Sequence, residues 1–187
     1  WSKQIYRSNG LIGLIKLLFN YIRIWKTTIP GIIVAVPIII LIRLIRPFIF
    51  FRFGNLNSGR IGHWAQDVEL YLSEKELELH PNKSVDLFSF GRPPCNKQFA
   101  KMCEKKLFIR SFYRYLWMCN EIIPFGSAHT IKVGTVVNDS RDVIGCFEKT
   151  KSHLSFDHIE NNKGKKFLSE IGMKDGERFV CLIARDG

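Results

Sequence analysis

The spacing of apolar and polar residues divides the chain into a helical N-terminal part and a part in which strands and helices alternate. Between residues 10 and 27 polar residues recur every three or four positions, which predicts an amphipathic helix with a narrow polar stripe. The stripe consists of Lys16, Asn20, Arg23 and Thr27. A helix with so narrow a polar face is suited to a membrane interface.

The following run, 27–42, contains no charged residue. It is shorter than the roughly 20 apolar residues that a straight membrane span needs, and Pro37 lies in its middle, where proline kinks a helix. Lysine and arginine flank the run on both sides, so the charge asymmetry typical of a spanning helix is missing. Both flanks are therefore expected on the cytoplasmic side, which indicates a re-entrant or monotopic insertion; a single crossing is the alternative.

From residue 47 onward the pattern predicts an α/β domain. Short runs rich in aromatic or β-branched residues predict buried strands at 47–54, 85–90 and 179–184. Helices are expected over 63–79, from an Asn96 cap to about 108, and from a capping box at Asp157 and Glu160 to Gly172. Residues 111–150 are ambiguous, with short strands expected near 131–137 and 143–147. Strands that alternate with helices predict a parallel sheet.

Charge is distributed unevenly along the sequence. No Asp or Glu precedes Asp67, whereas residues 1–66 hold nine Lys or Arg; of the 28 basic residues, the remaining 19 face 17 acidic ones. The net charge of +11 thus divides into +9 and +2. Because the N-terminal basic residues alternate with Leu, Ile, Phe and Trp, they favour an anionic membrane over nucleic acid as the partner. The five cysteines form no C-x-x-C pair, which favours reduced thiols.

The strongest candidate for ligand binding is the glycine-rich loop 54–63, between a predicted strand and a predicted helix. Loops at the carboxyl ends of strands and helix N-termini bind anions in α/β sheets. Here Gly59, Arg60 and Gly62 are the candidate substrate-binding residues, and His63 is a candidate base. The spacing matches neither the P-loop nor the dinucleotide fingerprint. The alternative is a tight turn that binds nothing.

A second candidate is the pair Arg185 and Asp186, directly after the predicted strand 179–184. A cation at this end of a buried strand is placed to meet a phosphate, and a surface strand terminus is the alternative. His153 and His158 are five positions apart and do not share a helix face. No metal site is expected.

The sequence contains an ordered set of five motifs, each of which occurs once. They are Arg60-Ile-Gly-His63, Asp86-Leu-Phe-Ser-Phe-Gly91, Cys95-Asn-Lys-Gln98, Ser152-His-Leu-Ser-Phe156 and Phe179-Val-Cys-Leu-Ile-Ala-Arg185-Asp186. In this set, residues 47–186 resemble bacterial glycosyltransferases from surface-polysaccharide gene clusters. The resemblance implies two Rossmann-like halves, a nucleotide-sugar donor in the cleft between them, and no other cofactor. It implies that Arg185 contacts the donor diphosphate, although Ile183 stands where a histidine is often found.

These expectations give a domain plan and a function. Residues 1–46 form a membrane-associated segment, 47–177 the acceptor-side Rossmann-like domain, and 178–187 the first strand of a donor-binding domain. The function expected from the resemblance is sugar transfer from a nucleotide sugar to a glycan or lipid-linked acceptor, at the cytoplasmic face of the inner membrane. Arg185 and His63 are the expected catalytic residues. The alternative is a non-enzymatic, membrane-tethered binding or assembly module for polysaccharide export.

Overall fold

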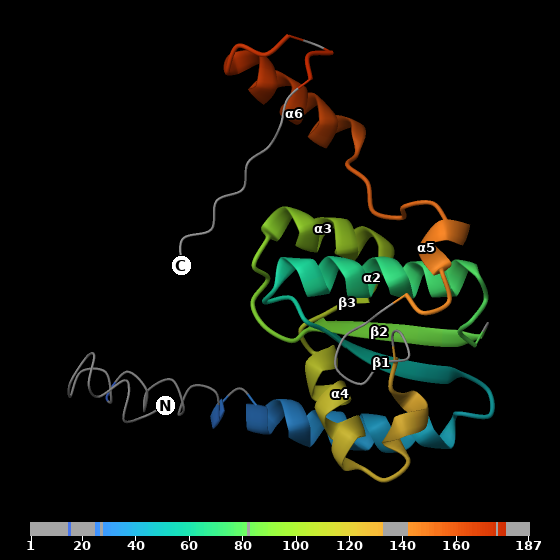
Figure 1. Cartoon of the computed structure of the whole chain (residues 1–187). Helices are drawn as coiled ribbons and strands as arrows, with labels where there is room; N and C mark the ends of the chain where they lie inside the picture. The colour runs from blue at the N-terminus through green and yellow to red at the C-terminus, as the bar shows by residue number, and fades with distance from the viewer. Residues whose placement is uncertain are drawn as a thin grey trace. The chain divides into compact units, whose positions relative to one another are not determined.

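The computed structural model describes residues 15, 25–26, 28–81, 83–132, 142–174 and 176–178. They fall into two compact units, one that ends at His153 and one that begins at Leu154. The first unit contains a sheet with helices, and the second contains one long helix (Figure 1). The helix over 28–44 belongs to the same unit as the sheet. The division expected from the sequence into 1–46, 47–177 and 178–187 stays a prediction.

A parallel sheet forms the centre of the first unit. Its strands are β1 (Phe50–Leu56), β2 (Ser84–Phe90) and β3 (Phe108–Ile109), in the order β1-β2-β3. Thr130 adds a parallel bridge to Phe53, and the N–H of Ile131 donates to the Phe53 carbonyl at 2.9 Å. The chain therefore moves outward from β1 to β3 and then returns to the other side of β1.

Helices cover both faces of this sheet (Figure 1). On one face lie α2 (Ile61–Glu76) and α3 (Lys97–Lys106); on the other lie the helix over 28–44 and α4 (Tyr113–Ile122). Ring contacts bind α2 to β2, with Tyr71 against Phe88 at 4.9 Å between centroids. The expected α/β class with a parallel sheet is thus confirmed.

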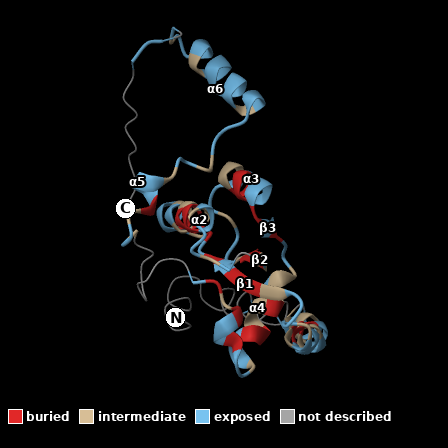
Figure 2. Ribbon diagram, turned by 90° about the vertical axis from the view of Figure 1, so that its right-hand side faces the viewer, coloured by how far each residue is buried: buried red, intermediate tan, exposed pale blue. Residues whose placement is uncertain are grey.

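The helix over 28–44 packs one side into the core of the first unit. Ala35, Ile39 and Ile42 are buried together with Phe53 of β1 and with Leu116 and Cys119 of α4. At Gly31 an added Cβ would lie 2.7 Å from the Tyr115 ring, so only a residue without a side chain allows α4 this close. In Figure 2 the buried residues, in red, mark this interface and the sheet.

The charge-free run 27–42 is therefore helical over the residues described, and Pro37 does not end the helix. None of the helices formed by described residues has the length and apolar character that crossing a membrane requires. Of the amphipathic helix expected over 10–27, only Ile15, Trp25 and Lys26 are described, and each is helical. The rest of that prediction lies outside the described residues.

Two expected elements are wrong in position or type, and two further elements were not predicted. The first strand starts at Phe50, three residues later than expected, because 45–48 form a turn in which the Phe48 N–H donates to the Ile45 carbonyl. Residues 146–149 form helix α5 (Cys146–Lys149) rather than part of a strand, since the Asp142 carboxylate accepts the N–H groups of Cys146 and Phe147. The segment 111–150 also contains α4 and the 3-10 turn η1 (Gly126–His129), which the pattern left unassigned.

Other elements match their predictions closely. Strand β2 covers the predicted 85–90, and the Asn96 side chain accepts the N–H of Phe99 at the start of α3. In the second unit α6 (His158–Glu170) begins with the predicted capping box of Asp157 and Glu160. Gly172, with φ of +89°, follows its end as expected. Helix α6 has no buried residue, and it is pale blue over most of its length in Figure 2.

Candidate anion-binding site at the carboxyl edge of the sheet

The loops that follow the three strands meet at one edge of the sheet, which we call the carboxyl edge: residues 57–60, 91–96 and 110–111. Because the strands are parallel, their carboxyl ends lie on the same side of the sheet. The edge also includes the point where the strand order reverses, since Thr130 pairs with β1 on the side opposite β2. In open α/β sheets ligands bind outside the carboxyl ends of strands at such a reversal.

Backbone and side-chain hydrogen bonds hold the first two loops together. Ser58 is fully buried; its hydroxyl donates to the Arg92 carbonyl and accepts the Arg92 N–H at 3.2 Å. The Cys95 N–H donates to the Ser58 carbonyl at 2.9 Å, and the Gly91 N–H to the Leu56 carbonyl at 2.9 Å. The two loops therefore form one rigid platform rather than independent turns.

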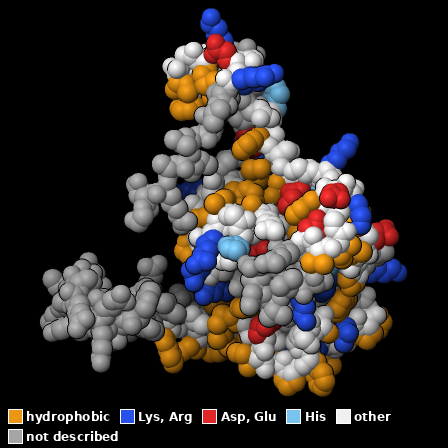
Figure 3. Space-filling view, in the orientation of Figure 1, with side chains coloured by type: hydrophobic (Ala, Val, Ile, Leu, Met, Phe, Trp, Pro, Cys, Tyr) orange, Lys and Arg blue, Asp and Glu red, His pale blue; other side chains and the backbone are white. Residues whose placement is uncertain are grey.

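The carboxyl edge carries three arginines and no carboxylate. Arg60, Arg92 and Arg110 are exposed, and the segments 57–60, 91–96 and 110–111 contain no Asp or Glu. Among the described residues, the ion pairs of the first unit involve none of these three side chains. Figure 3 shows basic side chains gathered at the end of the sheet where α2 begins. The edge therefore has a positive potential suited to an anion.

Two helix N-termini add to this potential. Helix α2 begins after Arg60 without a side-chain cap, and neither α2 nor α3 has an acidic residue in its first turn. The free N–H groups of a helix N-terminus carry a partial positive charge that favours anions. The edge thus combines guanidinium groups with backbone donors, the two kinds of group that bind phosphate in α/β proteins.

The structure brings four of the predicted site residues to this edge. Gly59 and Arg60 lie in the loop after β1, whereas Gly62 and His63 lie in the first turn of α2, and Arg60, Gly62 and His63 are exposed. Among the described residues, nothing lies within 4 Å of a Cβ added at Gly62. At Gly59 it would contact only the Arg92 side chain, at 3.0 Å.

Gly91 is the position at the carboxyl edge where the structure leaves no room for a side chain. At Gly91 an added Cβ would lie 2.9 Å from the Leu56 carbonyl oxygen and 3.1 Å from the Asn55 side chain. A side chain there would separate the loop from β1. The sequence pattern does not single out Gly91 for this role, because the contact depends on how β1 and β2 pair.

Arg185 and Asp186 lie outside the described residues. Their predicted place next to the donor site stays a prediction. The same holds for the strand expected over 179–184.

A buried polar cluster, which the sequence analysis missed, lies near the other end of the strands. Arg52 and Asp86 are register partners, 5% and 4% exposed, and form a bidentate pair with both distances 2.7 Å. The Tyr71 hydroxyl also donates to Asp86 at 2.5 Å. The cluster continues through His80, whose ring contacts Arg52 at 3.0 Å and Glu74 at 2.9 Å.

The pKa shifts in this cluster follow from burial and hydrogen bonding. Burial alone would raise the pKa of Asp86, but the hydrogen bonds from Arg52 and Tyr71 outweigh it and the pKa is lowered. Burial, together with the bond to Asp86, raises the pKa of Tyr71 well above its usual value. Every member has a partner and the cluster faces the amino ends of the strands. We therefore assign it to stability and not to ligand binding.

His153, from the Ser152–Phe156 motif, has a structural role in the first unit. Its ring lies between two carboxylates of α2, with Nδ1 2.9 Å from Glu69 and Nε2 2.7 Å from Glu76. Its backbone N–H also donates to Glu69. These contacts attach the chain that follows α5 to α2. Among the described residues, no three His, Cys, Asp or Glu side chains converge as metal ligands do.

The cysteines of the first unit are free thiols at Cys95, Cys103, Cys119 and Cys146. Burial raises the pKa of the Cys103 thiol to about 12, and burial also raises the pKa of Cys119. These two thiols stay protonated at neutral pH and are poor nucleophiles. Cys95 is exposed in the loop at the carboxyl edge.

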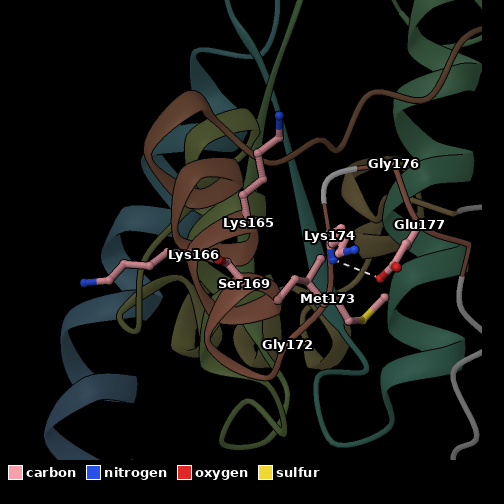
Figure 4. A pocket seen from close by; sticks show the side chains of 9 residues that line it. Lys165, Lys166, Ser169, Gly172, Met173, Lys174, Gly176 and Glu177 are labelled. Atoms are coloured by element: carbon pink, nitrogen blue, oxygen red, sulfur yellow. Dashed lines mark hydrogen bonds between the residues drawn. The ribbon is translucent and has the colours of Figure 1, made fainter.

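The second unit contains a hollow of about 790 Å³ beside the end of α6. Lys165, Lys166 and Lys174 are among its lining residues, but their side chains point in different directions (Figure 4). The Lys174 N–H donates to the Glu177 carboxylate at 2.9 Å, which closes a local turn. Because its cations do not converge, we do not regard the hollow as a ligand site.

Comparisons with protein-family models, with curated proteins and with solved structures found no match for this chain.

Proposed function

We propose that this chain is the acceptor-side part of a membrane-associated glycosyltransferase that binds a nucleotide sugar at the carboxyl edge of a Rossmann-like sheet. The observation that carries the proposal is the cationic edge, with Arg60, Arg92 and Arg110 and no carboxylate in the loops after the strands. A nucleotide sugar has two phosphates, and guanidinium groups bind phosphates with paired hydrogen bonds. The ordered set of motifs supports sugar transfer as the reaction.

In this proposal the residues of the edge have separate roles. The arginines bind the diphosphate, and the backbone around Gly59 and Gly62 at the start of α2 contacts a phosphate oxygen. His63 accepts the proton of the acceptor hydroxyl. Arg185, positioned by Asp186, stabilises the diphosphate as the sugar–phosphate bond opens, which is electrostatic catalysis of a developing charge.

The proposal also includes the membrane. Residues 1–46 attach the protein to the cytoplasmic face of an anionic inner membrane, which brings a lipid-linked or growing glycan acceptor to the edge. The seven basic residues of this segment and its lack of any acidic residue support this attachment.

The test is calorimetric titration of the whole chain with a panel of nucleoside diphosphates. We expect Arg92→Gln and Arg60→Gln each to weaken binding about tenfold, because a hydrogen-bonded charge contributes roughly 1.5–3 kcal/mol. Arg114→Gln is the matched control, since Arg114 is an exposed arginine of α4 on the opposite face of the sheet. Unchanged affinity in both edge variants would contradict the proposal, as would no binding by the wild type.

The second candidate function is a membrane-tethered binding module. The observation that favours it is that the loops after β1, β2 and β3 contain no Asp or Glu, so His63 is the only imidazole or carboxylate base in the segments 57–63, 91–96 and 110–111. A module of this kind binds the diphosphate without turnover. A transfer assay with the full-length protein and the nucleotide sugar that binds most tightly distinguishes the two functions.

A further inference from the structure

The side of the 28–44 helix that faces away from the core is apolar and exposed. Ile33 is 66% exposed and Leu44 is 71% exposed. Ile29, Val34, Ile40 and Leu41 on this side are also exposed. No charged residue occurs between 28 and 42. Soluble monomers seldom expose so long an apolar stripe unless something binds it.

The end of α4 and the turn after it expose two more apolar side chains, Ile122 at 78% and Phe125 at 84%. Hydrogen bonds from Arg43 connect this turn to the helix. Its guanidinium donates to the carbonyls of Ile123 and Pro124 and, at 3.1 Å, to the side chain of Asn120. The helix and the turn are therefore parts of a single surface. Figure 3 shows hydrophobic side chains along the bottom of the first unit in that view.

Phe125 is held in an unusual backbone conformation. Its φ is +66°, in the left-handed region that residues other than glycine, asparagine and aspartate seldom adopt. The next residue fixes the turn, because an added Cβ at Gly126 would lie 1.9 Å from the Asn120 carbonyl oxygen. The strained backbone of Phe125 lowers the stability of the fold, yet it keeps an aromatic side chain in solvent. Backbone strain of this kind is found most often at functional sites.

The charges near this surface are mainly positive. Exposed cations precede the helix at Lys26 and follow it at Arg46. A third, Arg114, lies on α4 next to Tyr115, which packs against Gly31 of the helix. The acidic residue nearest this turn in the sequence is Glu121, at the end of α4; its carboxylate accepts a hydrogen bond from the Thr130 hydroxyl at 2.8 Å. An apolar strip with basic residues around it complements an anionic lipid surface.

We propose that the exposed side of the 28–44 helix and the turn 122–125 together dock on an anionic lipid bilayer. We call these residues the lipid-facing surface. The helix lies in the plane of the interface, because its other side packs against β1 and α4, and Phe125 enters the acyl boundary beside it. This inference rests on the membrane attachment in the proposed function, and it adds a contact 80 residues away from the N-terminal segment.

The experiment places an environment-sensitive fluorophore in the whole chain at position 125. The variant is Phe125→Cys in a background with Cys95→Ser and Cys181→Ser, and the control carries Phe108→Cys instead, since Phe108 is 72% exposed in β3. Vesicles of phosphatidylcholine with or without phosphatidylglycerol are added. We expect a blue shift at 125 with the anionic vesicles, quenching by lipid-borne quenchers, and neither effect at 108.

Binding variants complete the test. Asparagine tolerates the left-handed conformation, so Phe125→Asn keeps the fold while removing the aromatic ring. We expect Phe125→Asn and Leu44→Gln each to weaken binding to anionic vesicles at least about tenfold, as loss of one large buried apolar side chain implies. Phe108→Asn leaves vesicle binding unchanged, and Phe125→Asn leaves nucleotide binding at the carboxyl edge unchanged.

Two results would overturn the inference. One is vesicle binding with the fluorophore at 125 still in water, which would leave the N-terminal segment as the only membrane contact. The other is a dimer in lipid-free solution, detected by sedimentation, that Phe125→Asn dissociates, which would make the surface an interface between two copies. Neither result depends on whether the chain binds a nucleotide sugar, so this inference and the proposed function fail separately.

Discussion

Replacing Asp86 by asparagine removes the charge at the centre of the buried cluster near the amino ends of β1 and β2. In the wild type its carboxylate accepts two hydrogen bonds from Arg52, both 2.7 Å, and one from Tyr71, 2.5 Å. Asparagine has nearly the same shape but no charge, so the Arg52 guanidinium stays buried without a counter-ion. We expect Asp86→Asn to lower the free energy of unfolding by about 3–5 kcal/mol, the usual cost of breaking one side of a buried ion pair.

That loss is large against a total domain stability of about 5–15 kcal/mol. The assay is urea denaturation followed by far-UV circular dichroism, with Tyr71→Phe as a graded comparison that removes one hydrogen bond to a charged group and costs about 1.5–3 kcal/mol. The double variant Arg52→Met with Asp86→Leu removes both charges, and we expect it to recover much of the loss.

The pair also predicts how stability depends on pH. The folded-state pKa of Asp86 lies below its usual value of 3.8, so its contribution is complete above that pH and disappears as the pH falls through the lowered folded pKa. The Asp86→Asn variant should lack this acid-dependent part. A change of less than about 1 kcal/mol at neutral pH in Asp86→Asn would refute the reasoning, because it would mean that Arg52 finds water or another partner without cost.

Three further predictions follow from single contacts. Burial lowers the pKa of His129 below 6.5, so its contribution to stability is complete above that pH and is lost as the pH falls below it. We therefore expect the urea midpoint to decrease when the pH is lowered from about 7 to about 5, and to decrease less in His129→Gln. Gly91→Ala should destabilise the first unit by about 1–3 kcal/mol because its Cβ would meet the Leu56 carbonyl. Gly62→Ala, with open space around it, should instead stabilise α2 by up to about 1 kcal/mol. Thermal melts should therefore show a lower melting temperature for the first variant and a higher one for the second. Arg43→Met should speed hydrogen exchange at the end of α4 by about tenfold or more, since it removes hydrogen bonds to the turn after α4.

Elements with a local cause were predictable from the sequence. The Asn96 cap, the capping box of Asp157 and Glu160 and the left-handed Gly172 each depend on residues within a few positions, so their sequence signals are sufficient. Helix α5 also has a local cause, the Asp142 carboxylate, which lies four positions before the first residue of the helix. The loop around Gly59 and Arg60 was located because it follows a strand and precedes a helix.

What only the tertiary structure decided involves residues far apart in the chain. The register of β1 against β2 pairs Arg52 with Asp86 and joins Ser58 to Arg92, in both cases across 34 positions, and no local pattern encodes that register. The 28–44 helix is apolar on all sides, so the sequence alone does not show which side is buried. Packing against Tyr115 at Gly31 and against Phe53 buries one side, and the hydrogen bonds from Arg43 to a turn 80 positions away then place Phe125 beside the side that remains exposed.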